Sequence, residues 1–204
     1  MSTYIQNFKK FQPLLNELIM RDIKTKYRKS ILGVFWTILN PLFMMVVLSV
    51  VFSNMFKFDV EYFPVYLLSG QLIFNFFNEA TTNAMGAIVA NGPLIKKIYV
   101  PKYMFVLSRI FSSSINLLAS FTAMIFVMLA MRVELHYTVL LAPIPLIFIV
   151  FFSLGVGLIL SAITVKFRDI MHLYSVFVTA LMYLTSWCIL FRAVIRLGGT
   201  ERNL

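Results

Sequence analysis

The sequence is poor in the side chains on which most catalytic and metal sites depend. Of its 204 residues, only 13% are charged, two are histidine and one, Cys188, is cysteine. A soluble domain carries about 25% charged residues. A lone cysteine excludes an internal disulfide framework and a cysteine metal cluster. We therefore expect neither a metal site nor a bound cofactor.

The sequence also lacks the motifs that mark a membrane enzyme or an ATPase. It contains no HExxH, no GxxxxGK[ST] phosphate loop and no GxSxG. Its two histidines, His136 and His172, lie far apart in the chain. We expect no catalytic residues and no enzyme activity, so that any ATP hydrolysis that powers this protein would take place in a partner subunit.

What the sequence has instead is long apolar runs, and hydrophobic residues make up 60% of the chain. A membrane-spanning helix needs about 20 mostly apolar residues. The runs that reach this length are 31–56, 63–90, 103–131, 138–164 and 171–191. The sequence therefore predicts an all-α integral membrane protein with about five transmembrane helices, which form one membrane domain over residues 31–191.

The distribution of charge predicts how the chain crosses the membrane. The net charge is +10, and most lysines and arginines flank the apolar runs, which favours a topology signal over nucleic-acid binding. Basic residues mark cytoplasmic loops, and here they precede the first run and follow the second and fourth. We expect a cytoplasmic N-terminus and short outer loops at 57–62 and 132–137. The basic tail at 192–204 does not fit this pattern and is atypical.

Residues 1–30 form a polar, basic segment with an apolar stripe at helical spacing. The stripe consists of Phe11, Leu14, Leu15, Leu18 and Ile19. Flanking charges favour an amphipathic helix that lies in the membrane interface among the lipids; a plain cytoplasmic stub is the alternative. The segment has no apolar stretch followed by a cleavage site, so it is not a secretory signal peptide.

Two charged residues lie inside the apolar runs, Glu79 in the second and Arg109 in the third. A charge in lipid is costly unless it is paired, and the two runs are joined by one loop. We expect an intramembrane pair between Glu79 and Arg109 that fixes the two helices. The alternative is that Arg109 extends to the lipid headgroups.

Small, polar and aromatic residues leave two interpretations open. A four-residue repeat of Ser108, Ser112, Asn116 and Ser120, with Gly155 and Gly157 in the fourth run, favours close helix packing; a transport path lined by the hydroxyls is the alternative. Aromatic residues make up 16% of the chain. They fit the aromatic belts of a membrane protein, or a channel that stacks sugar rings. The candidates for channel aromatics are Phe35, Trp36, Phe74 and Phe77.

Three strings of the sequence are similar to one family. The first is RDIKTKYRKSILGVFW at 21–36, followed by Asn40-Pro41; the others are NGPLIKKIYVP at 91–101 and KFRDI at 166–170. They fall in register with the expected topology. In these strings the chain resembles the permeases of type-2 ABC exporters that move polysaccharides such as O-antigen, capsule and teichoic acid, and the likeness runs from about residue 15 to about residue 185.

The resemblance implies a permease of the bacterial cytoplasmic (inner) membrane. It further implies a homodimer of two permease copies on two cytoplasmic ABC ATPase subunits, which exports a lipid-linked glycan. The helix ending near Lys29 would act as a gate, and the three strings would contact the ATPase. The implied ATPase-coupling residues are Lys24, Tyr27, Lys29, Pro93, Lys96, Lys97, Tyr99, Pro101, Lys166, Arg168 and Asp169.

The sequence departs from the family pattern near residue 185. Members of the family continue with short outer helices and a sixth span, whereas this chain reads SWCILFRAVIRLGG at 186–199. We expect a truncation or frameshift there. The alternatives to an exporting permease are therefore a transport-inactive remnant that inserts in the membrane, with or without a bound ATPase, and an unrelated small-molecule exporter or channel.

Overall fold

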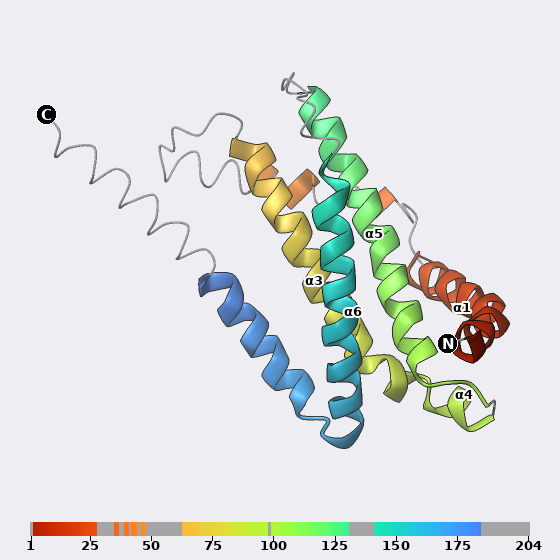
Figure 1. Cartoon of the computed structure of the whole chain (residues 1–204). Coiled ribbons are helices and arrows are strands. Elements are labelled where there is room, and N and C mark those ends of the chain that lie inside the picture. Colours follow the sequence, from red (N-terminus) through yellow and green to blue (C-terminus); the bar gives the residue numbers. More distant parts are fainter. Residues whose placement is uncertain are drawn as a thin grey trace, which may run out of the picture.

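The computed structural model describes residues 2–27, 35–36, 39–40, 42–44, 46–47, 63–97, 99–130 and 141–184. Over these ranges the chain is helical apart from short connections and contains no strand, which confirms the predicted all-α class for the described part. The helices are α1 (Ser2–Tyr27), α3 (Phe63–Ala90), α4 (Gly92–Lys97), α5 (Tyr103–Ala130), α6 (Pro143–Lys166) and the helix Ile170–Leu184 (Figure 1).

The helix bounds follow the apolar runs and their end signals. α3 ends where the Asn91 side chain donates a hydrogen bond to the Ala87 carbonyl at 2.8 Å, which satisfies a carbonyl of the last turn. α6 begins at Pro143 rather than at 138, because proline suits the first turn of a helix. In the described part, the stretches Tyr103–Leu129 and Pro143–Lys166 are long and apolar enough to cross a membrane. The number of five spans stays a prediction, and the predicted outer loops and the tail lie outside the described residues.

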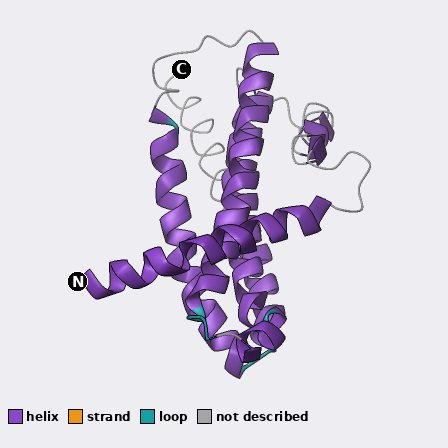
Figure 2. Ribbon diagram, turned by 90° about the vertical axis from the view of Figure 1, so that its right-hand side faces the viewer, coloured by secondary structure: helices purple, strands orange, loops and turns teal. Residues whose placement is uncertain are grey.

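α3, α5 and α6 lie side by side as a bundle, and α1 runs across them (Figures 1 and 2). α3 packs against both α5 and α6, while α1 packs against α5. α3 therefore contacts both of the other long helices of the described bundle, and α5 and α6 also contact each other.

The contact between α3 and α6 depends on small residues. On α6 the buried residues are Ser153, Gly157, Ser161 and Thr164. A Cβ placed on Gly157 would lie 2.9 Å from the Cβ of Ala84 and 3.1 Å from Cδ1 of Ile110. A Cβ on Gly155 would meet nothing within 4 Å. Close packing, as predicted for these glycines, thus applies to Gly157 and not to Gly155.

The α4 end of the bundle holds one apolar cluster that includes parts of five helices, α1, α3, α4, α5 and α6. Leu18 of α1 packs there with Ala84 of α3 and Phe105 of α5, and Leu94 and Ile95 of α4 pack against them. The stripe predicted on α1 therefore contacts protein: Leu15 and Leu18 are only 5% and 4% exposed. α1 and α4 are held by the same core.

The helix Ile170–Leu184 is joined to α3 by a buried hydrogen bond. The Tyr174 hydroxyl donates to Oγ1 of Thr81 at 2.7 Å, and the Thr81 hydroxyl donates in turn to the Phe77 carbonyl. Tyr174 and Val178 also form an apolar cluster with Met85 of α3. This helix is thus tied to the face of α3 that carries Thr81 and Met85.

Tyr174→Phe is expected to lower the free energy of unfolding by about 1 kcal/mol, because one buried hydrogen bond is lost while Thr81 keeps its bond to the Phe77 carbonyl. The measurement is unfolding of the purified chain in mixed micelles. Tyr183→Phe is the control on the same helix, since Tyr183 is exposed. An equal effect of the two variants would contradict a role for the hydrogen bond.

Candidate functional site

Two polar stripes run along facing helices of the bundle. On α3, polar residues recur every four positions at Gln71, Asn75, Glu79 and Asn83. Residues four apart lie on one face of a helix. The matching stripe on α5 consists of Ser112, Ser113, Asn116 and Ser120.

The stripes are joined by side-chain hydrogen bonds. Nδ2 of Asn116 donates to Oε1 of Glu79 at 2.8 Å, and Nδ2 of Asn83 donates to Oγ of Ser113 at 3.3 Å. Asn116 is the middle residue of the apolar stretch Tyr103–Leu129. The hydrogen-bonded carboxylate of Glu79 thus lies beside the centre of a helix long enough to span a membrane.

The structure does not form the predicted pair between Glu79 and Arg109. Each of them pairs with α1 instead. Oε1 of Glu79 accepts from Nζ of Lys26 at 2.8 Å, and Nε of Arg109 lies 3.4 Å from Oδ2 of Asp22. Asp22 also pairs with its neighbour Arg21 at 3.0 Å.

The reason for this difference is depth along the bundle. α3 and α5 are antiparallel neighbours, and a helix rises 1.5 Å per residue. The hydrogen bond of Glu79 to Asn116 sets its level on α5, which is seven residues, or about 10 Å, beyond Arg109. α1, which crosses α5, supplies a lysine for the deeper carboxylate and an aspartate for the shallower arginine.

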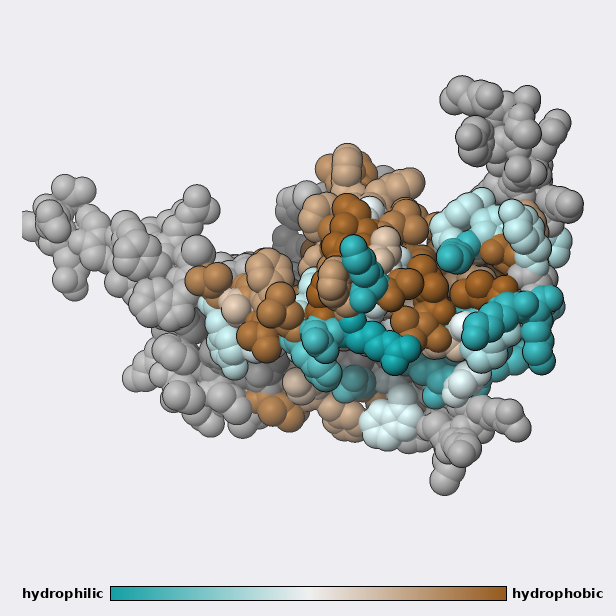
Figure 3. All heavy atoms as spheres, turned by 90° about the horizontal axis from the view of Figure 1, so that it is seen from below, coloured by the Kyte–Doolittle hydropathy of each residue, from teal (hydrophilic) through white to brown (hydrophobic). Residues whose placement is uncertain are grey.

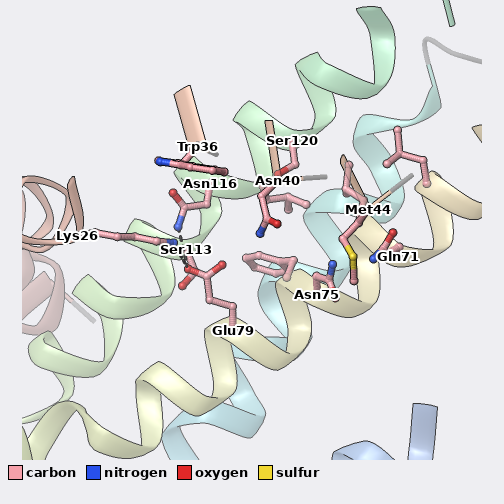
Figure 4. Close-up of a pocket in the computed structure, with 14 residues that line it drawn as sticks. Lys26, Trp36, Asn40, Met44, Gln71, Asn75, Glu79, Ser113, Asn116 and Ser120 are labelled. Atoms are coloured by element: carbon pink, nitrogen blue, oxygen red, sulfur yellow. Dashed lines mark hydrogen bonds and ion pairs between the residues drawn. The ribbon is translucent and has the colours of Figure 1, made fainter. Parts of the chain in front are cut away.

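A cavity of about 470 Å³ opens between the two stripes (Figure 4). Gln71, Asn75 and Glu79 line it from α3, and Trp36 and Asn40 line it from the segment before α3. The cavity wall also carries Lys26, Met44, Leu68, Leu72, Phe76, Ser113, Asn116, Leu117 and Ser120. Oε1 of Gln71 is buried and has no hydrogen-bond partner among the described residues.

A second cavity, of about 680 Å³, adjoins the first toward the α4 end. The two share Lys26, Glu79, Ser113 and Asn116. The second cavity is more highly charged, because Arg21, Asp22 and Arg109 line it as well. Of the serine and asparagine repeat found in the sequence, Ser112, Asn116 and Ser120 line cavities, whereas Ser108 is buried and donates to the Phe105 carbonyl of its own helix.

The structure does not bring the four candidate channel aromatics together. Trp36 lines the 470 Å³ cavity. Phe77 stacks on Phe152 of α6 with ring centroids 5.7 Å apart, and Phe74 packs against the cluster of Tyr174. Phe35 is exposed. Positions 74 and 77 turn away from the stripe because each residue of a helix rotates by about 100°.

The predicted ATPase-coupling residues that the structure describes lie mainly at the α4 end of the bundle. α4 carries Pro93, Lys96 and Lys97, and the turn after α6 carries Arg168 and Asp169; α4 and this turn lie at the same end (Figure 1). Seen from this end, hydrophilic side chains gather between apolar ones (Figure 3).

The remaining predicted coupling residues have varied settings. Tyr99 is 99% exposed, Pro101 is partly buried, and Lys166 lies 5.3 Å from the ring centroid of Phe167. Lys24 is exposed on α1, and Tyr27 is the last residue of that helix. Lys29 lies outside the described residues.

Sequence reasoning missed Gln71, Asn75 and Asn83. Their spacing of four from Glu79 was the available signal, because three amides in register with a carboxylate define a polar face on an otherwise apolar run. It also missed Lys26 and Asp22 as partners, since nothing in the spacing of α1 fixes where that helix crosses the bundle.

Several named transport proteins are similar to this chain in sequence. The chain is 28% identical over 181 residues to the O-antigen export system permease protein RfbA of Myxococcus xanthus. The aligned region covers 89% of this chain and 70% of the relative. It is 25% identical over 181 residues to the polysialic acid transport protein KpsM of Escherichia coli, covering 85% and 68%. For the capsule polysaccharide export inner-membrane protein BexB of Haemophilus influenzae, the identity is 27% over 160 residues, covering 76% and 59%.

The family model that describes ABC-2 type transporters matches residues 13–193. The match includes all three strings on which the resemblance was based, and it continues past residue 185, where the sequence was expected to depart from the family. It gives the remnant hypothesis no advantage over an exporting permease. The chain therefore belongs to the ABC-2 type transporter family.

Proposed function

We propose that this protein is the membrane permease subunit of an ABC transporter that exports a lipid-linked polysaccharide. The observation that carries the proposal is the family match over residues 13–193, together with relatives that are named for the export of O-antigen or capsule polysaccharide or for polysialic acid transport. The protein would act as a multi-pass protein of the inner membrane with a cytoplasmic N-terminus, and two copies would form the transporter.

In this proposal a cytoplasmic ATPase subunit binds the α4 end of the bundle. Lys97 and Arg168 support this proposal because both side chains are exposed. They lie on a short helix and in a hydrogen-bonded turn, and not in a stretch that is distinguished by its charge alone. The turn is held by hydrogen bonds from the amides of Met171 and His172 to the carbonyls of Arg168 and Asp169. Because Leu94 packs in the same core as Leu18, movement of α4 would be transmitted to α1, the helix that would act as a gate in this proposal.

Charge reversal at Lys97 or at Arg168 is expected to uncouple export from ATP hydrolysis, because a reversed charge opposes docking of the ATPase. Export of the glycan and ATP hydrolysis are measured in the same inverted membrane vesicles. Lys102→Glu is the matched control, since it makes the same charge change at an exposed position of the same connection. Unchanged export by both the Lys97 and Arg168 variants would refute the coupling role.

The first test of the function is co-purification from native membranes in mild detergent. Recovery of a nucleotide-binding subunit in stoichiometric amount, together with ATP-dependent export in vesicles, is the expected result. A chain that is recovered alone and vesicles that move no glycan would overturn the proposal.

A further inference from the structure

The 470 Å³ cavity carries polar side chains that the packing of the helices does not use. Oε1 of Gln71 is buried without a partner among the described residues, and Asn75 is exposed to the cavity. Polar side chains at membrane depth are rare, and they face the interior of a bundle or a water-filled space where they mark a functional path. Gln71 and Asn75 are therefore candidates for contact with a ligand rather than for helix packing.

The charge of the cavity selects the class of ligand. Its only ionisable lining residues in the described part are Lys26 and Glu79, which pair with each other at 2.8 Å. The two opposite charges of this pair neutralise each other, so the wall of the cavity has no net charge that would attract an anion or a cation. The cavity suits a neutral, polar ligand, unlike the adjoining cavity with its additional arginines.

The remaining lining groups match hydroxyls and the apolar faces of rings. A side-chain amide both donates and accepts hydrogen bonds, as a sugar hydroxyl does, and Gln71 and Asn75 offer two such amides. Trp36 and Leu117 supply apolar surface to the same cavity. Concave sites of this kind combine an apolar lining with a few placed polar groups.

We propose that this cavity, between α3, α5 and the segment that carries Trp36, binds a neutral, hydroxyl-rich part of the transported molecule, namely one or more sugar units of the glycan. The proposal rests on the function proposed above and adds a site to it. Gln71 and Asn75 contact the hydroxyls, Trp36 contacts a ring face, and the pair of Lys26 and Glu79 keeps the wall neutral.

The test blocks the cavity after the protein has folded. Cys188→Ala removes the native thiol, and Asn75→Cys then places one thiol at the cavity wall. Vesicles that contain the assembled transporter are treated with the uncharged reagent N-ethylmaleimide. Asn78→Cys is the matched control, because Asn78 is an exposed asparagine of the same helix that lines neither cavity. The Cys188→Ala chain alone reports any effect of the reagent on the ATPase.

Because Asn75→Cys removes one of the proposed ligand amides, export is expected to fall about tenfold before treatment. Modification is expected to abolish the export that remains, while the modified Asn78→Cys transporter keeps exporting. As a second variant, Gln71→Met keeps the volume but removes the amide, and it should lower export about tenfold, the value of one hydrogen bond. Normal export by fully modified Asn75→Cys would overturn the proposal, and so would loss of the ATPase subunit on modification, which would assign the cavity to assembly. If the unmodified Cys188→Ala transporter moves no glycan, the proposed function itself fails.

Discussion

Lys26→Met is expected to lower the free energy of unfolding by about 2 kcal/mol, because it leaves the Glu79 carboxylate at the middle of the bundle with only the neutral amide of Asn116. The loss is smaller than for a fully buried pair, since the two side chains are 47% and 35% exposed. Adding Glu79→Gln should recover most of the loss, because the unpaired charge is removed and the hydrogen bond from Asn116 can still form.

Double-mutant cycles separate this arrangement from the pairing that the sequence predicted. Lys26 with Glu79 and Asp22 with Arg109 should each show a coupling energy, whereas Glu79 with Arg109 should be additive within about 0.5 kcal/mol. The measurement is unfolding of each variant in mixed micelles. Lys24→Met is the control for loss of an exposed lysine on α1. Coupling between Glu79 and Arg109, with none to α1, would restore the predicted pair and reject the observed contacts.

Gly157→Ala is expected to destabilise the bundle by about 2 kcal/mol, and Gly157→Leu by considerably more, because the added atoms meet Ala84 at 2.9 Å and Ile110 at 3.1 Å. The Ala84 contact is the harder of the two to relieve, since its Cβ is fixed to the backbone of α3. Loss of the contact between α3 and α6 would appear as a lower unfolding midpoint and as lower recovery of folded chain from membranes.

The matched control for this prediction lies two residues away. A Cβ on Gly155 meets nothing within 4 Å, so Gly155→Ala should be neutral or slightly stabilising, as alanine is the better helix former. If Gly155→Ala and Gly157→Ala lowered the unfolding midpoint equally, the effect would come from glycine in a helix and not from close packing of α6 on α3.

The helices of the described bundle could be predicted well, because long apolar runs bounded by polar residues specify helices almost directly. The predicted run 63–90 coincides with α3, and the run at 103 begins where α5 begins. The contacts were harder to predict. Gly155 and Gly157 look alike in sequence, yet they face different directions because two residues turn a helix by about 200°.

In the candidate site, too, the residues could be predicted more easily than their contacts. Glu79 and Arg109 were singled out because an ionisable residue in an apolar run requires a partner, and in the structure each of them has a charged partner on α1. Their partners depended on the crossing position of α1, which results from the packing of Leu18 against Phe105 rather than from any local pattern. Trp36 was named for an aromatic path, and its neighbours in the cavity proved to be amides of α3 and α5.

The two faces of α3 also bear on the order in which the chain is synthesised. Its polar face, with Glu79 and Asn83, is matched by α1, made earlier, and by α5, made next, so these groups need not wait long in lipid for partners. Another position of α3 waits for α6: Phe77, which stacks on Phe152 of that helix, is apolar, and lipid accommodates it until α6 is made. The charged and amide side chains of α3 thus face helices that are synthesised early, and its apolar side chain faces a helix that is synthesised late. Each intermediate of membrane insertion is therefore tolerated by the bilayer.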